Sequence, residues 1–141
     1  MKDIFKPGDV KVFEKVVAPE DTAAFAAGEV HPVYATFALA RDAEWACRLF
    51  VIEMKEEDEE GIGTRITIDH LSPAMPGSRV RFTTVVKCIS GNEIVCSYEA
   101  SVGERLIARG EQGQRILKKE KIRKIFGELD YREKGKKGIG K

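Results

Sequence analysis

The sequence contains no apolar run of about 18 residues, and this excludes a transmembrane helix. Its opening stretch, MKDIFKPGDV, also lacks the apolar segment of a secretory signal peptide, so we expect a cytoplasmic protein. Charge of one sign is not in excess either. The formal net charge of +1 provides no general field for nucleic acid or an anionic membrane, and we expect neither as a partner.

Residues that bind metals or form disulfides are scarce. The three cysteines, Cys47, Cys88 and Cys96, have no CxxC spacing and lie in apolar neighbourhoods, where a free cysteine behaves as a small core residue. The two histidines, His31 and His70, are not close to a cysteine in the sequence. We therefore expect no zinc site, and nothing in these spacings favours a nucleophilic cysteine.

The rest of the composition suits one soluble globular domain. The chain has 141 residues, of which 43% are hydrophobic and 33% charged. A chain of this length buries roughly two-thirds of its unfolded surface. We predict a folded domain over residues 1–126 and a basic, flexible C-terminal tail over residues 127–141, because the last residues are rich in lysine and glycine.

A long helix is predicted from Val33 to about Met54. This stretch has no glycine or proline after Pro32, which stands where proline fits a helix start. Apolar residues recur every three or four positions and predict one buried face, and the charged residues lie mostly off it. The predicted face is formed by Phe37, Ala40, Ala43, Cys47 and Phe50; the charged residues are Arg41, Asp42, Arg48 and Glu53.

Strands are predicted on both sides of this helix. Residues 10–18 read as a strand, followed by a short turn of helix around residues 22–27. Alternation predicts further strands over residues 63–70, 79–90, 93–102 and from 105 onward, with a hairpin turn at residues 91–92. In the last strand, Gly110 and Gly113 predict a bend or bulge where another group approaches the backbone.

The predicted order is one strand, one alanine-rich helix and then four strands in an antiparallel meander. A single helix this apolar needs a sheet to cover it, so the fold class is α+β. One long central helix wrapped by a curved antiparallel sheet of about five strands is the hot-dog fold. Such domains commonly pair through an edge strand, so we expect a homodimer and consider a dimer of dimers possible.

Few residues here can transfer protons at neutral pH. His70 ends the predicted strand over residues 63–70, and its neighbour Asp69 points to the opposite face, so Asp69 cannot easily orient it. The simpler interpretation is a histidine at a strand end. Thr36 lies in the first helical turn, where its hydroxyl could accept a backbone N–H bond as a cap.

Glu44, beside the only tryptophan, has two interpretations. Arg41 and Arg48 stand three residues before and four after it, a spacing typical of surface ion pairs on a helix. Alternatively, Glu44 is a carboxylate used in chemistry, because it lies within one position of the apolar stripe among small neighbours that leave room for a ligand. Trp45 would then pack against the core and hold the helix in place.

Together these residues resemble the fluoroacetyl-CoA thioesterase group of hot-dog proteins. The resemblance rests on Thr36, on Glu44 eight residues later within EWAC, on the pattern GTxxxxxH that ends at His70, and on the Pro-Gly pair at 76–77. It extends from about Gly8 to Arg115. It implies hydrolysis of an acyl-CoA thioester by a threonine, glutamate and histidine triad, without a metal or other cofactor.

Carried over by position, the resemblance assigns the hydroxyl of the triad to Thr36, the helix carboxylate to Glu44 and the imidazole to His70. Gly63 matches a glycine that lies beside the acyl group. In such a site Glu44 would act as nucleophile or base and His70 as proton carrier. Donors for the oxyanion would come from Thr36 or from N–H groups at the helix start.

Two departures from that group bear on the substrate. The segment before Thr36 is shorter and offers only Phe25, Tyr34 and Phe37 as aromatic residues around the acyl group. This favours a short- or medium-chain acyl group other than fluoroacetyl. In the last strand, the group has a histidine and an arginine at alternate positions after a glycine; this chain has Gln112 and Gln114 there, with Arg115 one residue further on.

Coenzyme A carries phosphates, so basic residues are expected at the pocket mouth. The candidates are Arg65, Arg79, Arg81, Arg115 and the KGKK stretch of the tail, which could equally form a solvated surface.

Three functions remain in view. An acyl-CoA thioesterase with its site between subunits ranks first, then a non-catalytic module that binds or senses acyl-CoA. A hydratase ranks lower because Asp69 and His70 point apart.

Overall fold

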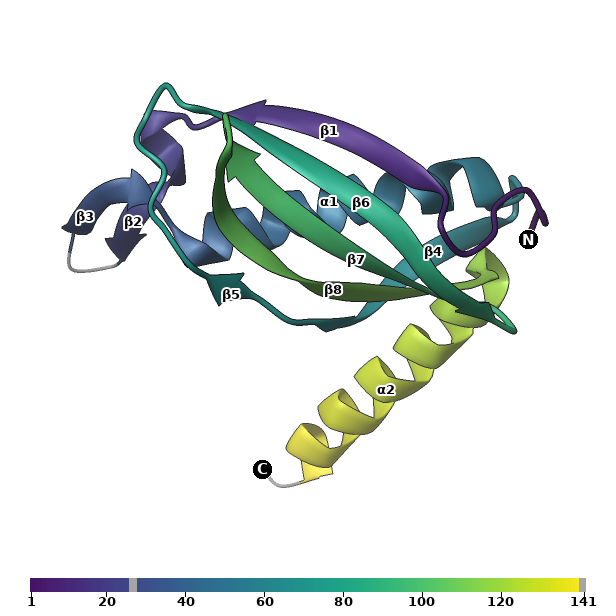
Figure 1. Cartoon of the computed structure of the whole chain (residues 1–141). Coiled ribbons are helices and arrows are strands. Elements are labelled where there is room, and N and C mark those ends of the chain that lie inside the picture. Colours follow the sequence, from purple (N-terminus) through teal and green to yellow (C-terminus); the bar gives the residue numbers. More distant parts are fainter. Residues whose placement is uncertain (26–27, 140–141) are drawn as a thin grey trace.

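The computed structural model describes residues 1–25 and 28–139 and shows one sheet wrapped around one helix (Figure 1). The strands of the sheet are β1 (Val10–Val16), β4 (Glu59–Ile66), β5 (Asp69–His70), β6 (Arg79–Ser90), β7 (Glu93–Val102) and β8 (Arg105–Lys118), and the enclosed helix is α1 (Thr36–Met54). Five strands form the order β1-β6-β7-β8-β4, and the short β5 also pairs with β8. All pairings are antiparallel. This confirms the predicted α+β hot-dog fold.

The central helix begins three residues later than predicted and ends as predicted. Ala35, in an extended conformation, is its N-cap residue, and Lys55 returns to an extended conformation after Met54. The side chains that face the sheet are buried at spacings of three or four residues, as an amphipathic helix requires. They include Leu39, Ala43, Ala46, Cys47, Phe50, Val51 and Met54.

Three residues of α1 lie differently from the prediction. Phe37 and Trp45, expected to pack in the core, are 47% and 43% exposed. Asp42, expected at the surface, is buried. The face that contacts the sheet runs through Leu39 rather than Phe37, so it is rotated relative to the predicted stripe. Burial of Asp42 is compatible with folding because its carboxylate accepts hydrogen bonds, described below.

The sheet is not a simple meander of the last four strands. β6, β7 and β8 follow one another as predicted, but β4 pairs with the far side of β8 and forms an edge. The predicted strand over residues 63–70 is also two strands, because β4 ends at Ile66 and β5 begins at Asp69. The register of β4 against β8 shifts by one residue between Gly63 and Arg65, where Thr64 is left over as a bulge.

Gly110 and Gly113 allow other groups to approach β8 closely, as predicted. A Cβ at Gly113 would lie 2.8 Å from the hydroxyl oxygen of Thr64 in the bulge. A Cβ at Gly110 would overlap the carbonyl oxygen of Thr67, which also accepts a hydrogen bond of 2.6 Å from the Tyr98 hydroxyl. The two glycines therefore make room for the irregular segment between β4 and β5.

Replacing Gly110 with alanine is expected to lower the free energy of unfolding by about 2 kcal/mol, because the added methyl group overlaps a backbone oxygen that cannot rotate away. Urea unfolding measures the change. Gly127→Ala is the control, since a Cβ there meets no atom within 4 Å. A Gly110→Ala protein as stable as the wild type would contradict this account of the irregular segment.

A hairpin precedes the central helix, and this corrects the predicted turn of helix around residues 22–27. A 3₁₀ turn (Pro19–Asp21) leads into β2 (Thr22–Phe25), which pairs with β3 (Gly28–Tyr34). Residues 26–27 of the predicted turn lie outside the described residues. The hairpin projects beyond the start of α1 (Figure 1), so it stands at the end of the domain where Thr36 and His70 lie.

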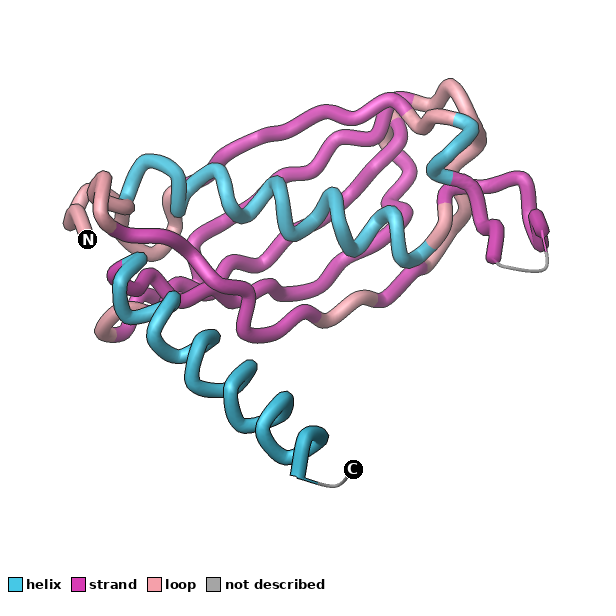
Figure 2. Tube along the Cα trace, turned by 180° about the vertical axis from the view of Figure 1, so that it is seen from behind, coloured by secondary structure: helices cyan, strands magenta, loops and turns pink. Residues whose placement is uncertain are grey.

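The C-terminal segment forms a helix up to residue 139, the last one described, and the flexibility expected for residues 127–141 stays a prediction. Helix α2 (Lys119–Ile139) leaves the end of β8 and extends away from the sheet (Figure 2). Its lysine, arginine and glutamate residues are good helix formers, and Lys134 pairs with Asp130 one turn earlier, 3.0 Å apart. Neither this helix nor any other in the described residues is long and apolar enough to cross a membrane. The domain division at residues 126 and 127 stays a prediction.

Candidate active site

Thr36 and His70 meet at the N-terminal end of α1. β5 places His70 opposite the buried Ala108, on the side of β8 that faces the helix. Nδ1 of His70 lies 2.9 Å from Oγ1 of Thr36, so the two side chains share a hydrogen bond. No side-chain cap bond occurs at the start of α1. The Thr36 hydroxyl is therefore paired with an imidazole and does not serve as a helix cap.

The second ring nitrogen of His70, Nε2, has no hydrogen-bond partner among the described residues. This atom is buried, and within the described residues it is the one buried side-chain nitrogen or oxygen without a hydrogen bond. Asp69 points away, as predicted from strand geometry, with a carboxylate oxygen 3.9 Å from Nε of Arg109. Thr36 thus fixes the His70 ring through Nδ1, and Nε2 is left to transfer a proton.

Glu44 is not the surface ion pair that its spacing allows. Arg41 donates hydrogen bonds to Asp42 and Asp21, and Arg48 donates to Glu60 at 2.5 Å. The donor that reaches Glu44 is Nε2 of Gln112, 3.5 Å from Oε1. Glu44 remains exposed and lines two adjoining surface pockets of about 270 and 350 Å³ between α1 and β4. This leaves the carboxylate accessible to a ligand.

Gly63 gives the Glu44 carboxylate its space. A Cβ at Gly63 would lie 2.3 Å from Oε1 of Glu44, so a larger residue would displace the carboxylate from this position. Gly63 lines both pockets with Glu44. Gly63 was predicted to lie beside the acyl group. In the structure it lies next to the candidate catalytic carboxylate.

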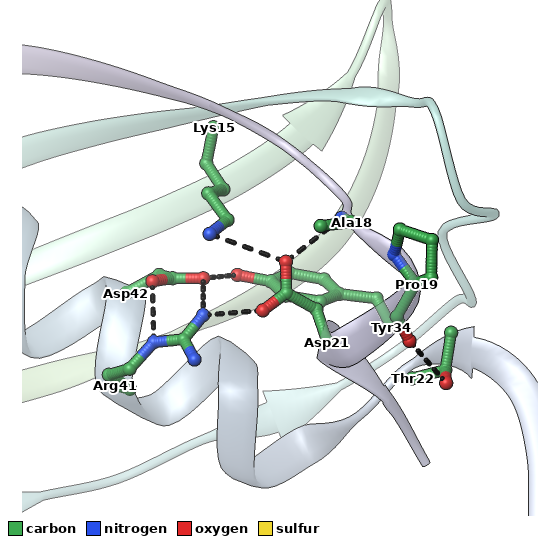
Figure 3. A network of polar contacts seen from close by, with 8 residues as sticks. All are labelled: Lys15, Ala18, Pro19, Asp21, Thr22, Tyr34, Arg41 and Asp42. Carbon is green, nitrogen blue, oxygen red and sulfur yellow. Dashed lines mark hydrogen bonds and ion pairs between the residues drawn. The ribbon is translucent and has the colours of Figure 1, made fainter. Parts of the chain in front are cut away.

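Tyr34, predicted to contact substrate, belongs to a buried polar network (Figure 3). The Tyr34 side chain is 1% exposed, and its hydroxyl donates to Oδ2 of Asp42 at 2.5 Å. Burial and this hydrogen bond raise the pKa of the Tyr34 hydroxyl, so it stays protonated as a donor. This placement argues against direct contact between Tyr34 and an acyl group.

The network continues from α1 to the turn before β2. Nη2 of Arg41 contacts Oδ2 of Asp42 at 3.1 Å and Oδ1 of the buried Asp21 at 2.8 Å (Figure 3). Asp21 also accepts from the backbone N–H of Ala18 at 2.9 Å and pairs with Lys15 at 3.3 Å. Burial alone would raise the pKa of Asp21, but the hydrogen bonds from Arg41, Ala18 and Lys15 outweigh it and leave the pKa lowered. The network fixes the segment before the hairpin to the helix that carries Glu44.

The other predicted contact residues lie apart from Glu44. Phe37 is exposed next to Thr36 on α1. Arg115 is exposed on β8, with Nε 3.9 Å from Glu93, and alternates with Gln112 and Gln114, which face the helix. Arg115 therefore points to the outer face of the sheet. Phe25 belongs to β2, but its side chain lies outside the described part of the structure.

Cysteine chemistry gains no support. Cys47 and Cys96 are buried, and Cys88 is exposed. The contact with Cys96, together with burial, raises the pKa of the Cys47 thiol, so Cys47 is held as a thiol rather than as a thiolate.

Two buried glutamines were missed as site residues. Gln112 and Gln114 are each 2% exposed and face α1 from β8. The signal in the sequence was the pair of polar residues at alternating positions, at the place where the resemblance leads one to expect a histidine and an arginine. Their burial depends on β4 and α1 folding over them, which sequence spacing does not show.

Within one chain the candidate residues form two groups. Thr36 and Glu44 are eight residues apart on one helix, a rise of about 12 Å. Thr36 and His70 form one group, and Glu44, Gly63 and Gln112 form the other. The pockets beside Glu44 include neither Thr36 nor His70.

Comparisons with known proteins identify the family of this chain. A hypothetical protein of Thermus thermophilus, described as a thioesterase superfamily member, is 38% identical; the alignment covers 94% of this chain and 98% of that one, with a TM-score of 0.89. A variant of the fluoroacetyl-CoA-specific thioesterase FlK, solved with fluoroacetate and coenzyme A, is 24% identical over 84% of this chain and 99% of that one, with a TM-score of 0.78.

A hot-dog-like protein from Thermanaerovibrio acidaminovorans is also 24% identical, over 89% of this chain and 93% of that one, with a TM-score of 0.80. At 24% identity, these last two similarities show the fold alone. No curated protein sequence matches the chain. The sequence model described as fluoroacetyl-CoA-specific thioesterase matches residues 17–120. Because this match covers most of the chain and the Thermus protein is 38% identical along nearly its whole length, the chain belongs to the fluoroacetyl-CoA-specific thioesterase family, a family of thioester hydrolases.

Proposed function

We propose that this protein hydrolyses a short- or medium-chain acyl-CoA thioester to the free acid and coenzyme A. The observation that carries the proposal is the bond between Thr36 and His70, which leaves Nε2 of His70 buried and without a partner in the described residues. An imidazole held in this way is suited to general acid and base catalysis. We expect no metal or other cofactor, and a cytoplasmic location remains a prediction.

The chemistry follows from what each group can do. Water adds to the thioester carbonyl carbon, with Glu44 accepting its proton as general base, and the carbon–sulfur bond then breaks. His70 donates a proton to the departing thiolate of coenzyme A. The developing oxyanion lies at the N-terminal end of α1, where the helix dipole and the Thr36 hydroxyl favour negative charge. In a covalent variant, Glu44 attacks the carbonyl carbon itself, the carbon–sulfur bond breaks, and water then hydrolyses the acyl–glutamate anhydride to the free acid.

We further propose that a second copy of the chain completes the site. Glu44 lies about 12 Å along α1 from Thr36, too far for both to contact one carbonyl group. β4, which carries Gly63 beside Glu44, is an edge strand of the sheet, and edge strands pair readily with another chain. A homodimer joined near β4 would bring Glu44 of one subunit toward the Thr36–His70 pair of the other.

Release of free coenzyme A from a panel of acyl-CoA thioesters tests the proposal. Replacing His70 with alanine is expected to lower the hydrolysis rate by about 10²-fold, because the proton donor to the thiolate is lost. His31→Ala is the matched control, since His31 is an exposed residue of β3, and its rate should equal that of the wild type.

Each outcome of this assay has a clear meaning. Equal rates for His70→Ala and the wild type would remove His70 from the site. Acyl-CoA binding without hydrolysis at any chain length would instead support the alternative of a non-catalytic acyl-CoA-binding module.

A further inference from the structure

The two buried glutamines of β8 form a continuous polar contact that leads to Glu44. Gln112 and Gln114 face the interior between β8 and α1, where most neighbours are apolar. A buried amide is unfavourable unless its donors and acceptors are satisfied. The hydrogen bonds that satisfy these two amides therefore indicate which group the pair contacts and orients.

The direction of these hydrogen bonds is set by Gln114. Its Nε2 donates to Oε1 of Gln112 at 2.9 Å. Because Oε1 of Gln112 is occupied, the Nε2 end of the same amide faces Glu44 and the backbone, donating to the carbonyl oxygen of Gly113 at 2.9 Å and approaching Oε1 of Glu44 at 3.5 Å. Rotating the Gln112 amide by half a turn would break its bond with Gln114. An N–H donor is thus held toward the carboxylate.

Glu44 has no other hydrogen-bond partner in the described part of the chain. Arg41 and Arg48, its neighbours on the helix, are bound to Asp42 and Asp21 and to Glu60. Oε1 of Glu44 lies between the Gln112 amide and the backbone at Gly63, where a Cβ would overlap it. From the residues that the structure describes, the second oxygen, Oε2, receives no hydrogen bond, and it stays available beside the pockets.

We propose that Gln112 and Gln114 are positioning residues that hold Glu44 in its working orientation, with Gln112 touching the carboxylate and Gln114 orienting Gln112. The inference rests on the proposed thioesterase function. An exposed glutamate on a helix has three freely rotating side-chain bonds and adopts many orientations. One fixed oxygen confines those orientations and presents the other oxygen to water or to the acyl carbon.

The neutral amides also leave the charge of Glu44 unpaired. A fixed arginine in hydrogen-bonding contact would compete with the substrate for the carboxylate, whereas an amide orients it with a weaker bond. This chain has two amides at the positions where the resemblance leads one to expect a histidine and an arginine. At these positions the two amides therefore give Glu44 a neutral contact in place of a charged one.

Gln112→Met is the decisive variant, because methionine fills a similar volume without donating a hydrogen bond. We expect kcat to fall by about 10-fold to 100-fold and KM to change by less than about threefold, since the variant misplaces a reacting group without removing a substrate contact. Gln114→Met should cause a smaller loss of the same kind, because the Gln112 amide then loses the bond that orients it. In a Glu44→Gln background, Gln112→Met should cause no further loss.

Thr84→Val is the matched control. Thr84 is another buried polar residue of the sheet, 1% exposed, and its hydroxyl donates to the backbone oxygen of Lys11 away from the site. Its loss should change thermal stability but leave kcat at the wild-type value. Thermal unfolding of all variants separates a positioning effect from a loss of folded protein.

The outcomes distinguish this inference from the proposed function. Wild-type hydrolysis that depends on Glu44 but is unchanged in Gln112→Met would overturn the positioning role and leave the proposed function standing. A lower kcat in Gln112→Met that persists unchanged in the Glu44→Gln background would also overturn it, because the effect would not act through Glu44. A wild type that hydrolyses no acyl-CoA would overturn both.

Discussion

Replacing Glu44 with glutamine is expected to reduce acyl-CoA hydrolysis by about 10²- to 10⁴-fold, the range associated with loss of a general base. Glutamine keeps the size of the side chain and can occupy the space beside Gly63, but it neither accepts a proton from water nor attacks a carbonyl group. Release of coenzyme A, followed with the best substrate of the panel, measures the loss. Binding of the substrate should change far less than kcat.

The same helix offers a matched control for this substitution. Glu53 is another glutamate of α1, half exposed, and it pairs with Lys11 far from the pockets beside Glu44. Glu53→Gln should therefore hydrolyse acyl-CoA at the wild-type rate. If Glu44→Gln retained full activity, Glu44 would be only a surface carboxylate, and the simpler interpretation of its position on the helix would stand.

Replacing Asp21 with asparagine is expected to lower the free energy of unfolding at neutral pH by about 3 kcal/mol. The buried carboxylate accepts hydrogen bonds from Arg41 and from the backbone of Ala18 and pairs with Lys15. Asparagine can accept only part of this set and turns an NH₂ group toward cations. The effect should appear in urea unfolding and should exceed that of Gly110→Ala.

The difference in the free energy of unfolding between wild type and Asp21→Asn should become smaller as the pH falls. The pKa of Asp21 is lowered in the folded protein, so its carboxylate contributes stability that is fully present above the unfolded value of about 4. That contribution is lost as the pH falls through the folded pKa, and the two proteins should converge in acid. Unfolding midpoints measured from pH 7 down to pH 2 test this.

Asp58→Asn is the control for the acid series, because Asp58 forms an exposed ion pair with Lys118. This variant should follow the wild type closely at neutral pH. A constant difference between wild type and Asp21→Asn at every pH would show that the Asp21 effect comes from shape and not from charge.

The local pattern of the sequence predicted the fold well, because the helix and most of the strands follow from the periodicity of apolar residues. The helix and the strands β1, β6, β7 and β8 follow from spacings of three to four residues or of two. Gly110 and Gly113 marked a close approach to the backbone before the approaching groups were known. The resemblance to a known family assigned Thr36 and His70 to the site, and the structure brings these two side chains together.

The features that the sequence analysis missed depend on long-range contacts. Asp42 resembles a surface residue until Tyr34 and Arg41 fold against it. Arg41 and Arg48 have the spacing to pair with Glu44, but stronger acidic partners from distant segments take both of them. The donor that reaches Glu44 comes from Gln112, 68 residues along the chain. No local spacing could have shown this choice of partners.

The bulge at Thr64 explains why Gly63 and His70 are seven residues apart in the sequence. In a regular strand, two residues face the same side only when they are an even number of positions apart. Gly63 and His70 are seven apart, yet Gly63 lies beside Glu44 and His70 beside Thr36, both on the side of the helix. The odd interval works because one residue is left out of the count where the register shifts.

With a six-residue interval and no bulge, Gly63 and His70 would keep these faces; with seven residues and no bulge, Asp69 would point at Thr36 and His70 would face outward. The odd interval in GTxxxxxH therefore places Gly63 and His70 on the same face only when a one-residue bulge lies between them. Chains that keep this histidine and this glycine on the helix side must change the interval and the bulge together.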